Sequence, residues 1–233
     1  MINYIIAGWT GGRRRHEQEY VDDRAVYIKK QIEQLNNLNH NIGQVTFVIN
    51  DNPDESIEVK NYINSIPNKI KDTDIVILRR PNIGMSYGAW AYVYEKYTNQ
   101  FDYYIIQEDD YIPVIDNFDK ILIELLHEKQ LDYLCELYKD NHASASGGIM
   151  FSRTLSDIYY KGGKLPFPNN SHYGNVEDYG QRKISKIFTD NGFKVGDYTD
   201  RYKFIFEKLT GGIITFGDES LDLIFAPSSY KIK

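Results

Sequence analysis

Short apolar segments alternate with amphipathic segments through the first half of the chain, and few folds accommodate that order. Buried strands are predicted at Tyr4–Ala7, Val45–Ile49, Ile75–Leu78 and Tyr103–Ile106. Helices are predicted between them at about Tyr20–Leu38, Ser56–Ile66 and Met85–Tyr97. Repeated strand–helix–strand units favour a mostly parallel sheet with helices on both faces. We therefore expect one compact α/β domain in the 233 residues.

The second half of the chain follows a different pattern. Its predicted elements are a helix at Phe118–Glu128, strands at Leu131–Tyr138 and Gly147–Ser152, a surface loop at Gly162–Ser171 and a helix within Asn175–Asn191. We see no linker between the two patterns. Residues 1–112 and residues 113–233 are therefore expected to be two halves of the same domain.

Three consecutive acids, Glu108, Asp109 and Asp110, follow the fourth apolar segment. In open α/β sheets the ligands bind at the carboxyl ends of strands, which is where these acids are expected. Adjacent carboxylates repel one another, so a cation is expected to offset their charge. Mn²⁺ or Mg²⁺, held by Asp110 or Asp109 and by phosphate oxygens, meets this need. The alternative is a solvated turn at a strand end.

Polar residues also follow the second and third predicted strands. Asp51 comes directly after the second strand, where a carboxylate could accept hydrogen bonds from a base or a ribose. Asp and Asn also stabilise turns by bonding their own backbone, which is the alternative there. Arg80, Asn82 and Gly84 lie between the third strand and the next helix, where cations and backbone N–H groups suit phosphate. The alternative is an ordinary strand-to-helix turn.

An acidic pair, Glu177 and Asp178, opens the last predicted helix. The helix dipole favours acids at this end, so N-terminal capping would explain the pair. A carboxylate held beside an acceptor hydroxyl could instead act as a general base.

Bulk properties exclude several classes of function. The net charge of −6 disfavours nonspecific binding to nucleic acid, because phosphate backbones require a basic surface. The single cysteine, Cys135, rules out an intrachain disulfide and a cysteine-rich zinc site. No apolar stretch approaches the roughly 20 residues of a membrane span. We expect a soluble cytoplasmic protein, with peripheral membrane association allowed.

The order of these motifs resembles nucleotide-diphospho-sugar glycosyltransferases of the GT-A fold, especially family-2-like enzymes. The resemblance covers roughly residues 4–196 and rests on Asp51, Arg80 with Asn82 and Gly84, Glu108 to Asp110, the Gly147–Arg153 segment, and Glu177 with Asp178. The acidic motif departs from the family's Asp-x-Asp form. The turn after the second strand also lacks the usual Gly-Ser-Thr.

The resemblance implies a Rossmann-like GT-A domain and a role for each motif. Residues implied to bind the nucleotide-sugar are Ala7, Gly8, Asp51, Arg80, Asn82, Gly84, Glu108 and Asp109. Asp110, followed by Asp109, is implied to bind Mn²⁺ or Mg²⁺, and Asp178 or Glu177 to deprotonate the acceptor. The implied reaction moves a sugar, with inversion, from a nucleotide-diphosphate sugar to a glycan or other hydroxyl acceptor. A UDP-sugar is the family default.

Two alternatives remain open at this stage. A sugar-phosphate nucleotidyltransferase shares an α/β sheet, a carboxylate-bound metal and a nucleotide, but usually carries a Gly-rich loop with a lysine after the first strand. Here Gly8, Gly11 and Gly12 are followed by arginines. A non-catalytic glycan-binding protein that keeps the same fold is the second alternative.

Overall fold

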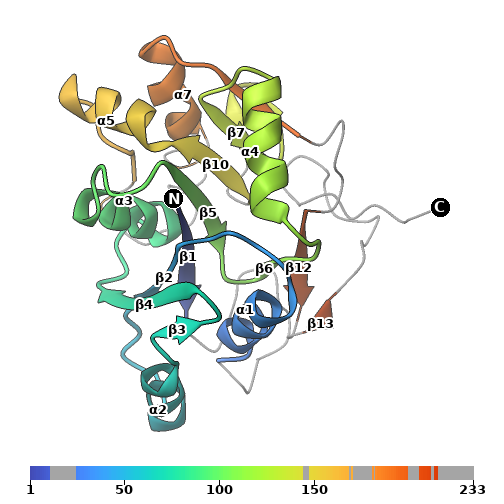
Figure 1. Cartoon of the computed structure of the whole chain (residues 1–233). Coiled ribbons are helices and arrows are strands. Elements are labelled where there is room, and N and C mark those ends of the chain that lie inside the picture. The colour runs from blue at the N-terminus through green and yellow to red at the C-terminus, as the bar shows by residue number, and fades with distance from the viewer. Residues whose placement is uncertain are drawn as a thin grey trace.

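Four parallel strands in the order β4-β2-β1-β5 form the centre of the sheet (Figure 1). They are β1 (Ile2–Trp9), β2 (Gln44–Asn50), β4 (Thr73–Arg80) and β5 (Tyr103–Glu108). The computed structural model describes residues 1–10, 25–143, 147–167, 169, 180, 182–198, 205–210 and 213–214. All four strands coincide with predicted ones, so the alternation of the first half correctly indicated a mostly parallel sheet.

The order in which successive strands are added to the sheet reverses at β1. From β1 the chain passes outward to β2 and β4, then crosses back to place β5 on the other side of β1. The register pairs Ala7 with Val48 on one side and with Glu108 on the other. The carboxyl ends of β1 and β5 therefore lie side by side at the topological switch point of the sheet.

The remaining strands complete an eight-stranded sheet of order β11-β7-β10-β5-β1-β2-β4-β3. Their bounds are β3 (Lys69–Ile70), β7 (Tyr133–Cys135), β10 (Gly148–Phe151) and β11 (Val195–Asp197). β10 runs antiparallel to both β5 and β7, and Gly148 pairs with Ile106. This antiparallel strand brings the start of β10 to the edge of the sheet where β5 ends.

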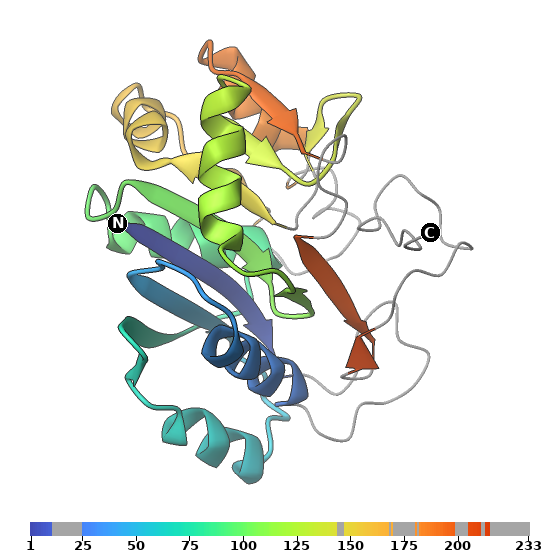
Figure 2. The same cartoon turned by 45° about the vertical axis from the view of Figure 1, so that its right-hand side comes forward.

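Helices cover both faces of the sheet (Figure 2). One face carries α1 (Val26–Asn37), α2 (Ile57–Ser65) and α4 (Phe118–Glu128), and the other carries α3 (Met85–Lys96), α5 (Ser152–Tyr160) and α7 (Lys183–Asp190). Ile5 and Ile6 show the consequence, because these neighbours are both buried but contribute to opposite hydrophobic clusters. Burial on both faces explains why β1 is apolar along most of its length.

A second, three-stranded sheet lies beyond the end of β5. It has the order β13-β12-β6, with β6 at Tyr111–Pro113, β12 at Phe206–Thr210 and β13 at Ile213–Ile214. Phe206 anchors it to the main core, because its ring centroid lies 5.6 Å from that of Phe118 and 6.4 Å from that of Tyr4. A short hairpin of β8 (Tyr138–Lys139) and β9 (His142–Ala143) completes the described strands.

Several elements differ from the sequence predictions. The strand predicted at Leu131–Tyr138 is confined to β7, and the strand predicted at Gly147–Ser152 gives way at Ser152 to the unpredicted helix α5. α1 begins at Val26, whereas the part of the predicted helix before residue 25 lies outside the described residues. The helix predicted within Asn175–Asn191 is represented by α7.

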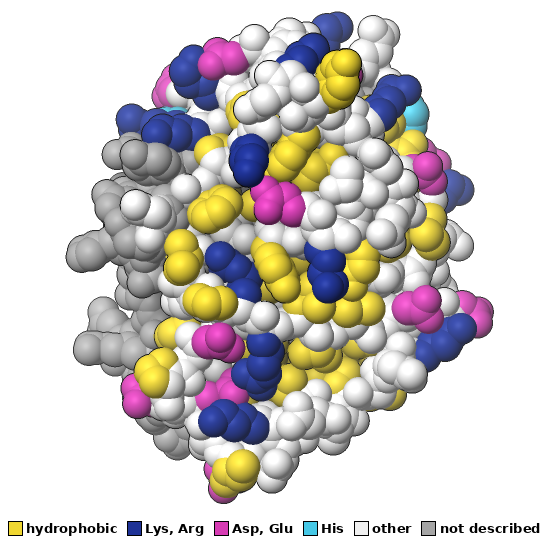
Figure 3. All heavy atoms as spheres, turned by 90° about the vertical axis from the view of Figure 1, so that its left-hand side faces the viewer, with side chains coloured by type: hydrophobic (Ala, Val, Ile, Leu, Met, Phe, Trp, Pro, Cys, Tyr) yellow, Lys and Arg dark blue, Asp and Glu magenta, His cyan; other side chains and the backbone are white. Residues whose placement is uncertain are grey.

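The face that looks to the left in Figure 1 carries both signs of charge, with hydrophobic side chains visible between them (Figure 3). Among the exposed hydrophobic residues of the described chain, Tyr92 on α3 and Tyr160 at the end of α5 are 38% and 91% exposed. None of the helices in the described ranges has the length and apolar character needed to cross a bilayer.

Candidate functional site

Four parallel strands end at one edge of the sheet, and several of the predicted site residues lie at these strand ends. Asp51 follows β2, Arg80 ends β4, and Glu108 ends β5 beside Ala7 of β1. Their proximity follows from the parallel arrangement, since the carboxyl ends of such strands share an edge. Asp109 and Asp110 follow β5 at this edge, and together with Glu108 they are called the acidic turn below.

Asp109 ties β5 to β1. Its backbone N–H donates to the carbonyl oxygen of Ala7 over 3.1 Å, and its Oδ2 accepts from the N–H of Trp9 over 3.0 Å. The residue is only 2% exposed. One carboxylate oxygen of Asp109 is therefore engaged inside the protein, where it holds the two strand ends together.

Gly8 leaves room for this contact. A Cβ at Gly8 would lie 3.0 Å from Cδ1 of Ile49 and 3.6 Å from Oδ2 of Asp109. A Cβ here would press on the side chain of Ile49, whereas its contact with Asp109 would be an ordinary van der Waals contact. The glycine at the end of β1 thus allows close packing of three neighbouring strand ends.

Glu108 is linked to the start of α3. Its Oε1 accepts a hydrogen bond from the hydroxyl of Ser86, in the first turn of that helix. Gly84 at the N-cap has a φ of 75°, a left-handed conformation that glycine adopts without strain. The helix begins close to the acids, and the positive end of its dipole partly offsets their charge.

Asp110 is half-buried, and groups from two other elements hold the main chain around it. The Nε2 of Gln31 in α1 donates to the carbonyl oxygens of Asp109 and Tyr111, over 3.0 and 2.6 Å. The N–H of Leu209 in β12 donates to the carbonyl oxygen of Asp110 over 2.6 Å. Sequence reasoning missed both contacts, because nothing in the sequence links these distant residues to the acidic turn.

Arg80 braces the turn between β4 and α3. Its two terminal nitrogens donate to Oδ1 of Asn50 over 2.8 Å and to the carbonyl oxygen of Ile83 over 2.6 Å. Arg80 is 9% exposed, and burial lowers its pKa, while the charges of Tyr92 and Asp51 act in the opposite direction. The guanidinium is therefore a buried positive charge that fixes the loop beside the acids.

Asp51 and Asn82 are more accessible than Arg80. Asp51 is exposed, and its backbone N–H donates to the carbonyl oxygen of Arg80 over 2.8 Å. Asn82 is half-buried, and its Oδ1 has no hydrogen-bond partner within the described part of the chain. Both residues are placed beside Arg80, at the edge where a ligand would approach.

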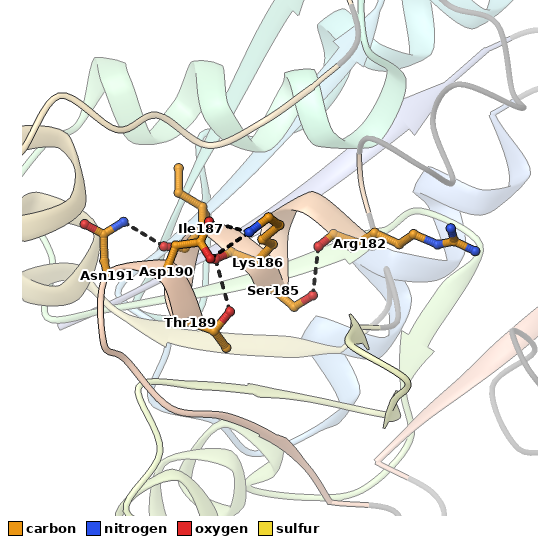
Figure 4. A network of polar contacts seen from close by, with 7 residues as sticks. All are labelled: Arg182, Ser185, Lys186, Ile187, Thr189, Asp190 and Asn191. Atoms are coloured by element: carbon orange, nitrogen blue, oxygen red, sulfur yellow. Dashed lines mark hydrogen bonds and ion pairs between the residues drawn. The ribbon is translucent and has the colours of Figure 1, made fainter.

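The predicted catalytic pair, Glu177 and Asp178, lies outside the described residues. The helix that follows them is well defined by its polar contacts (Figure 4). The hydroxyl of Ser185 donates to the carbonyl oxygens of Arg182 and Asn141, and Lys186 pairs with Asp190 over 2.7 Å. The side chain of Arg182 points away from the helix in this view.

The donor set at the turn suits a hard divalent cation. Carboxylate oxygens from Asp110 and Asp109 are the ligands that Mg²⁺ and Mn²⁺ prefer, and such ions need only one or two of them when phosphates and water complete the shell. No group of three or more His, Cys, Asp or Glu residues able to hold a metal occurs among the residues described.

Solved structures provide the relevant comparisons, since no protein-family model and no curated protein matches the chain. The mannosyltransferase PcManGT from Pyrobaculum calidifontis, in complex with GDP-Man and Mn²⁺, aligns with 12% identity and a TM-score of 0.54 over 84% of this chain and 54% of its own. S. aureus TarS 1–349 in complex with UDP aligns with 11% identity and a TM-score of 0.50 over 86% and 58%. The chain thus spans little more than half of each.

A third structure, the 4-diphosphocytidyl-2C-methyl-D-erythritol synthase from Anaerococcus prevotii, aligns with 10% identity and a TM-score of 0.50 over 94% of this chain and 91% of its own. The chain has a GT-A-like fold. Within this GT-A-like domain, the acidic turn follows β5 at the switch point. Arg80 ends the strand before α3, the helix whose Ser86 donates to Glu108. At such low identities the comparisons establish the fold alone.

Proposed function

We propose that the protein is a glycosyltransferase that moves a sugar from a nucleotide-diphosphate sugar to a glycan or another hydroxyl acceptor. The observation that carries the proposal is the position of the acidic turn, with Asp109 bound to the end of β1 at the switch point and Glu108 bound to the start of α3. Ligands of open α/β sheets bind at this point. The GT-A-like fold adds support, because solved structures of the same fold hold GDP-Man or UDP.

The donor would bind along the ends of β1, β2, β4 and β5. Asp51 would accept hydrogen bonds from the base or ribose, and Asn82 would offer its amide beside it. Arg80 contributes positive charge close by, while its own hydrogen bonds are made within the protein. Ala7, Gly8, Gly84, Glu108 and Asp109 would line the remaining wall. A UDP-sugar is the first donor to test.

Asp110 is the first candidate for the metal ligand and Asp109 the second. Mn²⁺ or Mg²⁺, when bound, would stabilise negative charge on the departing nucleoside diphosphate. Asp109 already uses Oδ2 to bind Trp9, whereas Asp110 is more accessible and follows it in the same turn. The positive end of α3 would add to this stabilisation at a distance.

Asp178, or Glu177, would take the proton of the acceptor hydroxyl as that oxygen attacks the anomeric carbon of the donor. The new glycosidic bond forms as the bond to the diphosphate oxygen breaks, so a single displacement inverts the anomeric configuration. In this scheme residues 1–112 bind the donor and residues 113–233 bind the acceptor.

A transfer assay with chelation and matched variants tests the proposal. Transfer from UDP-sugars and GDP-sugars to a panel of glycans should fall to background with EDTA and return with Mn²⁺. Asp178→Asn and Glu177→Gln address the base, and we expect at least one to lower kcat by about 10²-fold or more, as for loss of a general base. Lys186→Gln, on α7, changes an exposed charge at a residue to which we assign no role, and it serves as the control.

The same assay separates the alternatives. Full activity in both base variants would refute the base assignment, and undiminished turnover with EDTA would refute the metal. Release of pyrophosphate from a nucleoside triphosphate and a sugar phosphate would identify a sugar-phosphate nucleotidyltransferase. Glycan binding without binding of any nucleotide would indicate a non-catalytic protein.

A further inference from the structure

Gln31 is a fully buried amide on the face of α1 that packs against the sheet. Its neighbours on that face are apolar, and Ile28 and Leu35 are each 1% exposed. Burying an amide among such residues is costly unless it forms hydrogen bonds. Gln31 is therefore expected to form hydrogen bonds inside the protein.

One nitrogen of Gln31 binds two carbonyl groups. Nε2 donates to the carbonyl oxygen of Asp109 over 3.0 Å and to that of Tyr111 over 2.6 Å, which uses both of its N–H groups. The opposite orientation of the amide would place Oε1 against two carbonyl oxygens, so the hydrogen-bond pattern fixes the orientation. Only a side chain with two N–H donors on one atom satisfies both carbonyls in this way.

The two carbonyls lie on either side of Asp110. The carbonyl of Asp110 itself accepts from the N–H of Leu209 over 2.6 Å. Three successive carbonyl groups of the acidic turn are thus held by groups from other elements. Because the peptide planes on both sides of Asp110 are fixed, the direction of its Cα–Cβ bond is fixed as well.

We propose that Gln31 is a positioning residue, which sets the direction in which Asp110 presents its carboxylate to a divalent cation. The inference rests on the proposed function, because it concerns the metal of the same site. Gln31 does not touch the cation and acts through the backbone of the turn. Partners that orient a metal ligand commonly change metal affinity by about 10- to 100-fold when they are removed.

The experiment measures Mn²⁺ binding by the loss of the free-ion EPR signal, in titrations with and without UDP and GDP. Gln31→Leu removes both donors, and Gln31→Glu keeps the shape of the side chain while replacing donors with acceptors. Gln34→Leu makes the same chemical change three residues later on α1, where the side chain is only half-buried. Asp110→Asn shows how far the affinity for Mn²⁺ falls when a proposed direct ligand is changed.

Both Gln31 variants should bind Mn²⁺ about tenfold more weakly or worse, with Gln34→Leu unchanged. Circular dichroism of the metal-free proteins should show all four variants folded at the titration temperature. Folded Gln31 variants with wild-type affinity would overturn this inference and leave the proposed metal site standing. If both Gln31 variants failed to fold, Gln31 would be a structural core residue and the inference would be wrong. A wild-type protein that bound no Mn²⁺ in any titration would refute the metal site and this inference together.

Discussion

Asp109 and Asp110 are adjacent acids that the fold places in different surroundings. Asp109 is almost completely buried, and its carboxylate accepts the N–H of Trp9 at the end of the neighbouring strand. Asp110 is half-buried, at the bend where β5 leads into β6. The first residue therefore acts mainly on stability, whereas the second is more accessible and is the one we propose as the metal ligand.

This difference predicts that two substitutions affect stability to different extents. Asp109→Ala should lower the free energy of unfolding by about 1–3 kcal/mol, because the partly buried N–H of Trp9 would lose the carboxylate that accepts from it. Asp110→Ala should lower it by less, while abolishing Mn²⁺-dependent transfer. Urea denaturation at pH 7 gives both unfolding free energies. A larger loss for Asp110→Ala than for Asp109→Ala would contradict the assignment.

At the residue scale the sequence indicated which side chains lie at the carboxyl ends of the parallel strands, but not the contacts that each one makes. Asp51, Arg80 and the acids could be predicted because each follows an apolar strand in a parallel sheet. The internal hydrogen bonds of Arg80 could not be predicted, because they depend on how the turn before α3 folds back. Gln31 carried no signal, since its partners lie on a distant turn.

Among the elements, β12 contributes most to the site without having been predicted. It is five residues long, pairs with β6 directly after the acidic turn, and buries Phe206 and Leu209. So short a segment has too few residues to show a clear alternation. α3 was predicted from an amphipathic pattern over Met85–Tyr97, and β1 from the continuous apolar run Tyr4–Ala7 at its centre.

Glu207 in β12 makes stability depend on pH. Burial raises its pKa above the ordinary value of 4.5, and its Oε2 has no hydrogen-bond partner within the described ranges. The folded protein holds this proton more tightly than the unfolded chain. The stabilising contribution is therefore complete below pH 4.5 and disappears as the pH rises through the higher folded pKa.

Glu207→Gln should accordingly be more stable than the wild type at pH 7, with the advantage shrinking as the pH falls towards 4.5. Glu58→Gln is the matched control, because hydrogen bonds from the backbone N–H of Glu58 and from Ser56 lower the pKa of that carboxyl. Replacing this carboxylate by an amide should lower the free energy of unfolding at pH 7. Urea denaturation between pH 4 and pH 7 compares the variants. If the free energies of unfolding of Glu207→Gln and of the wild type changed with pH in parallel, the predicted effect of Glu207 would be wrong.

For the molecule as a whole, the proposed donor site predicts stabilisation by a ligand. A nucleoside diphosphate with Mn²⁺, at about 100 times its Kd, should add roughly 2.7 kcal/mol to the free energy of unfolding. For a protein of this size that corresponds to a rise in Tm of about 5–10 °C. A thermal-shift screen of UDP, GDP, dTDP and CMP, with Mn²⁺ or EDTA, measures it. Asp110→Asn should lose the Mn²⁺-dependent part, and an unchanged Tm with every nucleotide would count against a donor site.

The overall topology was predictable in its first half and less so in its second. Alternating strands and helices have few ways to pack, so a mostly parallel sheet containing β1, β2, β4 and β5 was predicted, whereas the order of these strands was not. β10 runs antiparallel, and its direction depends on long connections that carry no local signal. The acceptor side, with Glu177 and Asp178, remains a prediction from sequence.

The bond from Leu209 to Asp110 also bears on the order in which the protein is made. β1, β2, β4 and β5 are all synthesised well before β12, and they can pair as soon as they emerge from the ribosome. The acids of the turn emerge with β5, but the hydrogen bond to the carbonyl oxygen of Asp110 can form only after Leu209 has been made. We expect a nascent chain to carry the acids before their geometry is complete, so binding of the proposed metal should appear only after β12 has been made.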